Sequence, residues 1–181
     1  TWMEVTAVPV FAAWNAVITW WVMRQARIRA MGPSAVQEYT RIIFDETGEV
    51  GQEAQIEAFR AVGSAIVRTV DLHPNLVALM EALENRFGDP GNIVMDDSQL
   101  FLDQIYVLDC NEQEFVLRIL ALASIIDGKL QRRERILLQQ ALEKCGLEPD
   151  LNNVYRWRKA FLTGDVLEDE IVLGCLPGPL A

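Results

Sequence analysis

The residues best suited to chemistry lie in one stretch, IIDGKLQRRERILL (residues 125–138), where an aliphatic run stops and a charged run begins. Asp127 and Glu134 are the carboxylates in it that could hold a divalent cation. An EF-hand calcium loop that starts at Asp127 needs oxygen ligands at its third, fifth and twelfth positions. Those positions hold Lys129, Gln131 and Leu138. The stretch therefore does not match a calcium-binding loop.

Two further features argue against a metal site at this position. One Asp and one Glu are fewer oxygen ligands than Mg²⁺ or Ca²⁺ takes, unless other segments of the chain contribute. Nearby arginines also repel a cation; they are Arg132, Arg133 and Arg135. We therefore expect no cofactor, and a metal sensor or metal-dependent enzyme that uses Asp127 and Glu134 is kept as an alternative.

A turn between two helices explains the same residues without a metal. Gly128 permits the backbone conformation of a tight turn, and the Asp127 side chain can accept hydrogen bonds from the amides that follow it. Leu130 would then pack inward. Glu134 would lie near the start of the next helix, where negative charge is favourable.

The turn also carries a basic cluster that stands out against the composition of the chain. The 181 residues hold 16 Lys and Arg against 26 Asp and Glu, for a formal net charge of −10. A chain this acidic repels phosphate backbones, so we do not expect nucleic acid as a partner. The cluster itself could contact an acidic protein or an anionic lipid. Its members are Lys129, Arg132, Arg133 and Arg135.

The nucleophiles and bases of the chain do not suggest an enzyme. The only histidine is His73, directly before Pro74, and a Ser-His-Asp or Cys-His site would have to use it. The three cysteines are widely spaced and form no CxxC pair, which argues against a disulfide framework or a cysteine zinc site and is typical of a reducing compartment. They are Cys110, Cys145 and Cys175. We expect a non-enzymatic, cytoplasmic protein, peripheral to the inner membrane if it contacts lipid.

The order of residues around the turn follows a family pattern. An apolar helix leads into Ile125-Ile126-Asp127-Gly128-Lys129-Leu130, then comes Glu134, then an amphipathic helix that ends in Cys145-Gly146-Leu147. Over roughly residues 96–173 this resembles the TerB-like domains of tellurite-resistance proteins. The resemblance implies a small helical bundle, also found in front of certain co-chaperone domains, and a link to stress responses and membrane-associated assemblies. It also implies a divalent-metal role for Asp127 and Glu134, although such loops are usually richer in acids.

Residues 7–32, AVPVFAAWNAVITWWVMRQARIRAMG, form the most hydrophobic segment and include Trp14, Trp20 and Trp21. The spacing of its large apolar residues predicts a helix with a buried face. A membrane-surface helix is the second interpretation, with tryptophans at the interface and arginines at the headgroups. A full span is the third, although the apolar residues 7–23 are short beside the about 20 that a span needs.

The same segment also resembles one helix of EcsC-like bacterial proteins over residues 7–30. The residues that carry this resemblance are Pro9-Val10, Ala12-Ala13, Asn15-Ala16 and Ala26-Arg27. It implies that the protein works near a membrane.

The rest of the chain predicts an all-α, multi-helix bundle. Gly32-Pro33 is expected to end the first helix, because proline lacks an amide and favours the first turn of a new helix. Further helices are predicted at 34–44, 53–72, from 74 to about 87, 97–108, 112–126, from after 128 to a glycine cap at Gly146, 151–162 and 166–173. Three of these starts show the capping-box spacing: Asp96 with Gln99, Asn111 with Glu114, and Asp165 with Glu168.

These elements group into four predicted parts: a tryptophan-rich helix (1–32), an N-terminal subdomain (33–88), a C-terminal TerB-like subdomain (93–173) and a flexible tail (174–181). Residues 47–62 align with 127–142 at an offset of 80, which suggests two related helical units. The leading functional hypothesis is a non-enzymatic, TerB-like interaction module with a protein partner. The alternative is a peripheral membrane protein anchored by the first helix. The sequence indicates no oligomeric state.

Overall fold

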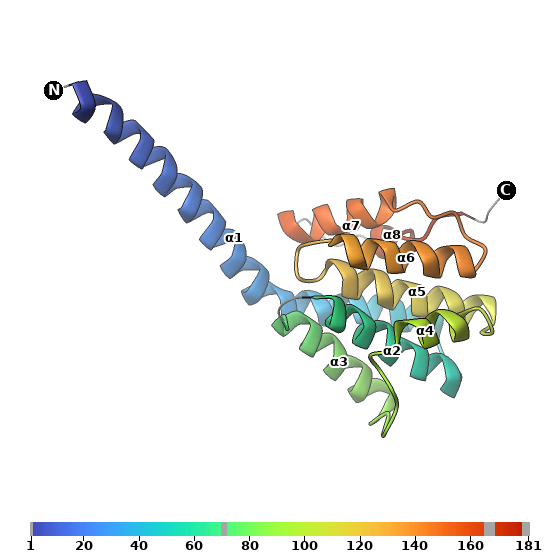
Figure 1. Cartoon of the computed structure of the whole chain (residues 1–181). Coiled ribbons are helices and arrows are strands. Elements are labelled where there is room, and N and C mark those ends of the chain that lie inside the picture. Colours follow the sequence, from blue (N-terminus) through green and yellow to red (C-terminus); the bar gives the residue numbers. More distant parts are fainter. Residues whose placement is uncertain (1, 70–71, 165–168, 179–181) are drawn as a thin grey trace.

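The computed structural model describes residues 2–69, 72–164 and 169–178, with side chains from residue 10 onward. The described residues form helices without any strand, which confirms the predicted all-α bundle (Figure 1). The helices are α1 (Trp2–Thr47), α2 (Gln52–Arg68), α3 (Pro74–Phe87), α4 (Ser98–Ile105), α5 (Cys110–Ile125), α6 (Arg132–Lys144), α7 (Asn152–Thr163) and α8 (Asp169–Leu173).

The first helix, α1, has two halves with different surroundings. Its 46 residues make it about 70 Å long at 1.5 Å per residue. The N-terminal half projects away from the body of the protein, whereas the C-terminal half runs through the body beside α3 and α5 (Figure 1). The change occurs near Ile28, the first described residue of α1 that is buried.

The predicted break of this helix at Gly32-Pro33 is wrong, because α1 continues to Thr47. One buried stripe runs along the helix past the proline, through Ile28, Gly32 and Val36, and on to Tyr39 and Ile43. Pro33 lies outside this stripe and is exposed. Packing against the body therefore keeps both sides of Pro33 on one helix axis and outweighs the missing amide.

The central helix is α5, as its uniformly apolar composition predicts. From Phe115 to Ile125 every residue except Arg118 is buried, and α5 contacts α1, α2, α6 and α7. One cluster of buried side chains extends from Val36 in α1 to Cys175 after α8. The two predicted subdomains therefore share one hydrophobic core.

The starts of α2, α3, α4, α5 and α7 lie within two residues of the predictions, whereas α2 ends at Arg68 instead of the predicted 72 and α4 ends at Ile105 instead of the predicted 108. The caps lie at Asp97 and Asp109 instead of the predicted Asp96 and Asn111, because these aspartates accept hydrogen bonds from the first-turn amides. Oδ1 of Asp97 lies 2.9 Å from the Leu100 amide, and Oδ1 of Asp109 lies 2.9 Å from the Glu112 amide. The predicted box of Asp165 and Glu168 lies outside the described residues.

The end of the chain is attached to the body as far as it is described. Cys175, within the predicted tail, is fully buried. The amide of Glu148 donates to the carbonyl oxygen of Gly178 at 3.1 Å. Residues 174–178 therefore pack along the body.

The turns before α2 and α6 have matching geometry at the predicted offset of 80. Gly48 and Gly128 both have positive φ, 73° and 80°. The residues that precede the two helices, Gly51 and Gln131, have nearly the same backbone angles, with ψ of 158° and 159°. The match is limited to the two turns, and the relation between two helical units stays a prediction.

One buried amide joins three helices. Asn75, in the first turn of α3, is fully buried, and its Nδ2 donates to the carbonyl oxygens of Ile126 (2.8 Å) and Ile28 (3.3 Å). Gly32 lies so close that a Cβ at this position would overlap the Asn75 side chain. The crossing of α1, α3 and the end of α5 therefore needs both an amide at 75 and a glycine at 32.

We expect Gly32→Ala to lower the free energy of unfolding by about 1–3 kcal/mol, because its methyl group overlaps the Asn75 amide. Asn75→Ala should cost a similar amount, since it removes the side-chain donor that the Ile126 and Ile28 carbonyl oxygens share. The double variant should be no less stable than Asn75→Ala alone, because the second change removes the group that the methyl meets. Urea denaturation of the native chain, the two single variants and the double variant measures this cycle. If the losses in free energy of unfolding of the two single variants simply add up in the double variant, the direct overlap is contradicted.

Candidate functional site

The Asp127-Gly128 turn closes the C-terminus of α5 with the predicted local bonds. Oδ1 of Asp127 accepts a hydrogen bond from the Lys129 amide at 2.6 Å, which is the expected Asx turn. The Gly128 amide donates to the Ile125 carbonyl oxygen at 2.8 Å, and Gly128 has a φ of 80°. Leu130 packs against the core, as expected.

Two neighbouring helices hold this turn in place. A Cβ on Gly128 would lie 2.8 Å from Ile28 Cδ1 of α1 and 3.0 Å from Leu162 Cδ2 of α7. The guanidinium of Arg158 donates to the Gly128 carbonyl oxygen through Nε (3.1 Å) and Nη2 (2.9 Å). The positive φ therefore favours glycine at 128, and the Ile28 and Leu162 side chains would have to shift to admit a Cβ.

Glu134 serves the start of α6. Its side chain is only 1% exposed, and Oε2 accepts a hydrogen bond from the Gln131 amide at 2.7 Å. This is the bond by which a third-position Glu reaches back to the cap residue. Burial raises the pKa of Glu134 to about 7, and the nearby Asp127 carboxyl adds to the rise.

The structure brings Asp127 and Glu134 to the same turn but adds no further ligands. Within residues 2–69, 72–164 and 169–178, no group of three or more His, Cys, Asp and Glu lies close enough to hold a metal ion. Both carboxylates accept backbone hydrogen bonds at the turn. A metal site built on this pair stays an untested prediction.

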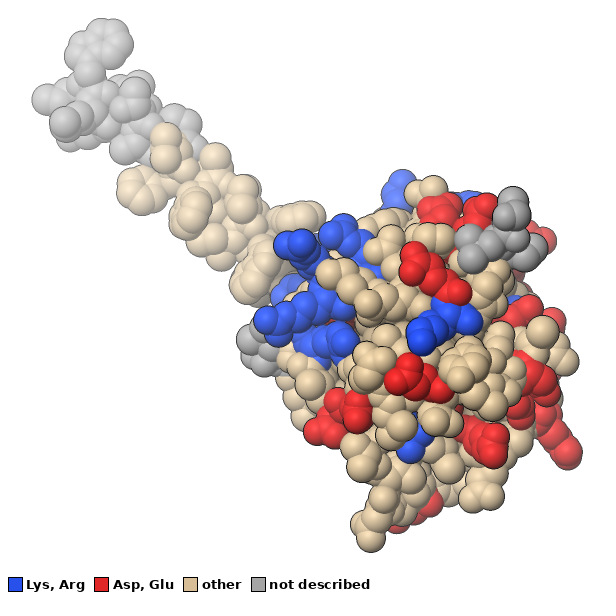
Figure 2. Space-filling view, turned by 45° about the vertical axis from the view of Figure 1, so that its right-hand side comes forward, with Lys and Arg blue, Asp and Glu red and all other residues tan. Residues whose placement is uncertain are grey.

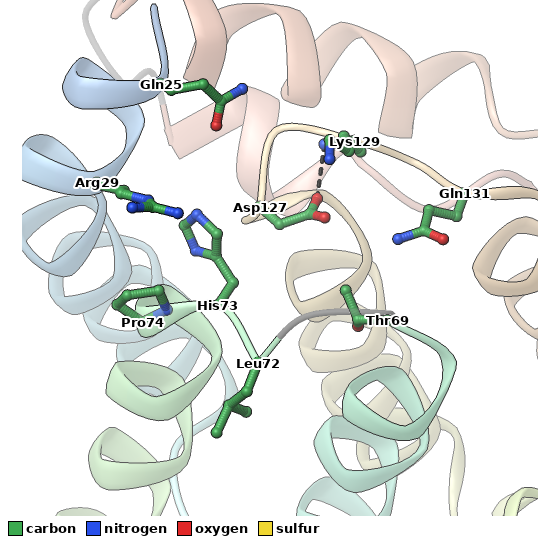
Figure 3. Close-up of a pocket in the computed structure, with 9 residues that line it drawn as sticks. All are labelled: Gln25, Arg29, Thr69, Leu72, His73, Pro74, Asp127, Lys129 and Gln131. Carbon is green, nitrogen blue, oxygen red and sulfur yellow. Dashed lines mark hydrogen bonds between the residues drawn. The ribbon is translucent and has the colours of Figure 1, made fainter. Parts of the chain in front are cut away.

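A cavity of about 320 Å³ lies beside the turn, between α1, the start of α3 and residues 127–131. Figure 3 shows Arg29 reaching from α1 toward His73, with Asp127 and Gln131 on the other side. Lys129, Gln25 and Thr69 are the other polar residues of its lining. Sequence analysis missed Gln25, Arg29 and His73 as neighbours of Asp127, because about 50–100 residues separate them in the chain and no local signal links them.

His73 caps α3 through one of its two ring nitrogens. Nδ1 accepts a hydrogen bond from the Asn75 amide at 3.3 Å, so His73 caps α3. Its Nε2 is buried and meets no hydrogen-bond partner in the described part of the chain. Burial lowers the pKa of His73 below its ordinary value; Asp127 opposes this shift, and Arg29 and Lys129 add to it.

The most exposed apolar surface is the projecting part of α1, residues 10–23, which we call the stem. Its three tryptophans, Trp14, Trp20 and Trp21, are 63%, 65% and 56% exposed. The interpretation of this segment as a buried helix is therefore wrong for the single chain, because the stem lies beyond the reach of the body (Figure 1). Among the described residues, no helix combines the length and the hydropathy of a membrane-crossing segment.

Basic side chains gather where the stem enters the body, and we call them the collar (Figure 2). Arg24 lies over the Trp20 ring at 5.7 Å, and Arg27 donates to the Thr163 carbonyl oxygen. The collar contains arginines of α1 and most of the basic cluster predicted from the sequence. Arg135 of that cluster is exposed further along α6 and is not part of the collar. The members of the collar are Arg24, Arg27, Arg29 and Lys129, together with Arg132 and Arg133, which directly follow Gln131 on the wall of the cavity that Arg29 and Lys129 line.

Acidic side chains concentrate at the opposite end of the body. The Gly51 amide donates to Glu112 Oε1 at 3.0 Å, which places the starts of α2 and α5 together. The exposed acids in this region include Asp45, Glu46, Glu49 and Glu53. On the face shown in Figure 2, cations gather around the base of the stem, whereas acids are spread over the rest of the body and are densest far from the stem.

Comparisons with protein-family models, with curated proteins and with solved structures found no match to this chain. The resemblances to TerB-like domains and to an EcsC-like helix therefore stay predictions.

The raised pKa of Glu134 predicts a loss of stability as pH rises. Between the ordinary glutamate value near 4.5 and about 7, the folded chain keeps a proton that the unfolded chain releases. The free energy of unfolding should then fall by up to about 1.4 kcal/mol per pH unit from this group. Glu134→Gln removes the titration and keeps an oxygen for the Gln131 amide.

Urea denaturation at several pH values between 5 and 8 (roughly the window that this linkage sets) measures the effect. The variant should gain stability relative to the native chain by about 1–3 kcal/mol across the window. Glu143→Gln, which removes an exposed carboxylate from the same helix, is the control. A constant difference between Glu134→Gln and the native chain at every pH would contradict the assignment.

Proposed function

We propose that this protein is a membrane-associated helical interaction module, in which the stem enters lipid and the collar holds the body at an anionic surface. The observation that carries the proposal is the stem itself. Residues 10–23 expose nine large apolar side chains, which no neighbouring part of the described body covers. A surface of this kind on a monomer is typical of a contact with a membrane or another molecule.

Lipid is favoured over a protein partner because the apolar side chains surround the stem. At 100° per residue, Trp14 and Trp21 lie on one side, whereas Trp20 and Met23 point to others. All four are more than half exposed. A partner helix would cover only one face, while acyl chains cover all of them.

The charge distribution supports the same orientation. No charged residue occurs between Glu4 and Arg24, and the collar follows directly. Cations at this level would meet anionic headgroups while the stem lies in the hydrocarbon. The acidic end of the body would then face away from the membrane, which reduces its repulsion by the lipid surface.

The body supplies the second part of the proposal, a protein-interaction surface. Arg132, Arg133 and Arg135 are exposed on α6, and no salt bridge within the described residues joins them to a carboxylate. Unpaired cations on a chain of net charge −10 favour an acidic partner. The expectation that the module is TerB-like and not an enzyme stays a prediction.

We expect the native chain to co-sediment with vesicles that contain phosphatidylglycerol, and the triple variant Trp14→Ser/Trp20→Ser/Trp21→Ser to stay in the supernatant. Each large aromatic side chain contributes about 1.5–3 kcal/mol when it leaves water, so the partition coefficient should fall more than about 100-fold. The fold should persist, because the stem lies outside the core; circular dichroism checks this.

The matched control replaces three exposed apolar residues of the body, Val94→Ser/Tyr106→Ser/Val107→Ser. It should bind vesicles as the native chain does. Equal binding by the stem variant and the native chain would remove the membrane proposal. A native chain that forms stem-dependent dimers and ignores vesicles would instead identify a second copy as the occupant.

A further inference from the structure

The cavity beside the Asp127-Gly128 turn continues toward the stem. A second hollow of about 550 Å³ lies next to it along α1, and Gln25, Arg29 and Lys129 line both. Trp21 and Gln25 are four residues apart on α1, and Arg29 follows after four more, so the three lie along one side of the helix. The combined groove is apolar at its stem end, where Trp21 lies, and polar at its body end.

We propose that this groove binds the headgroup of a single anionic phospholipid, with the phosphate between Arg29 and Lys129 and the glycerol backbone toward Trp21. The proposal rests on the membrane association proposed above. It adds a defined lipid site to the general attraction between the collar and an anionic surface. The polar cavity of about 320 Å³ is within the range of small-molecule sites, about 300–1,000 Å³.

The groups on the cavity wall suit a phosphate. Arg29 and Lys129 are exposed, and no salt bridge within the described residues joins either to a carboxylate. Because Nδ1 of His73 accepts the Asn75 amide, the neutral imidazole carries its hydrogen on Nε2. That nitrogen has no hydrogen-bond partner among the described residues and is closed off from solvent, so the ring would sense the charge of a bound phosphate without a direct bond to it.

One carboxyl in the same cavity limits the charge of the ligand. Asp127 lines the cavity together with Arg29 and Lys129. A second negative charge on the ligand would be repelled by this carboxyl at short range. The site therefore favours a monoanionic phosphodiester, such as the headgroup of phosphatidylglycerol, over a phosphomonoester.

Two double variants that remove the same charge distinguish lipid binding in the groove from the general attraction between the collar and an anionic membrane. Arg29→Gln/Lys129→Gln removes two cations from the groove, whereas Arg132→Gln/Arg133→Gln removes two collar cations outside its lining. Loss of two cations beside an anionic surface lowers partitioning about 30-fold in either case. We expect the groove variant to lose at least about tenfold more on phosphatidylglycerol vesicles, because it also loses direct hydrogen bonds to the phosphate. Equal losses would overturn the site.

The single histidine provides a second readout that needs no membrane. Short-chain phosphatidylglycerol below its micelle concentration should shift the His73 ring signals in NMR spectra saturably and raise the pKa of His73, since a nearby phosphate stabilises the imidazolium. Asp127, Arg29 and Lys129 are the charged groups that act on this ring. Arg29→Gln/Lys129→Gln should weaken the response at least about tenfold.

The probes distinguish the possible sources of phosphate. Short-chain phosphatidylcholine and inorganic phosphate at the same concentration should move the His73 signals far less than short-chain phosphatidylglycerol. An equal response to inorganic phosphate would overturn the lipid assignment in favour of a free-phosphate site, and no response to any probe would overturn the site itself. If His73 responds but vesicle binding does not depend on the stem, the lipid site stands and the membrane proposal is wrong. If vesicle binding depends on the stem but His73 does not respond, the membrane proposal stands and the lipid site is wrong.

Discussion

The close contact of the Asn75 amide with Gly32 is the constraint on which the arrangement of the protein depends. Through it, the start of α3 is bonded to Ile28 of α1 and to Ile126 at the end of α5. Both carbonyls are inside the protein, where a missing donor costs more than the bond itself contributes. The contact lies at Ile28 and Gly32, where α1 first becomes buried, so it fixes the helix close to the point at which the stem leaves the body.

At the Asp127-Gly128 turn, the hydrogen bonds that hold the backbone also determine which charges reach the surface. Asp127 and Glu134 both accept backbone amides at the turn and are almost fully buried. Their neighbours Lys129 and Arg132 remain exposed. The acids of this segment are thus withdrawn from the surface while the cations stay on it, and the surface around the stem is positive on a chain whose net charge is −10.

Local signals predicted much of the fold, and they failed where packing competed with them. Pro74 begins α3, α5 is central, and Gly146 ends α6 with a positive φ, all as expected. The same kind of signal was wrong at Pro33, where the buried stripe from Ile28 to Ile43 continues the helix. Caps shifted by one or two residues because several polar residues precede α4 and α5, and the side chains that bond the first-turn amides are those of Asp97 and Asp109.

The sequence by itself determined the helices, the uncharged N-terminal segment and the basic run after Gly128, because each depends on residues close in the chain. Tertiary structure decided that the stem is exposed, that α1 passes Pro33 without a break, and that Arg29, His73 and Lys129 line one cavity. These contacts join residues up to 100 positions apart. Their geometry depends on how whole helices pack, which periodicity and local motifs do not specify.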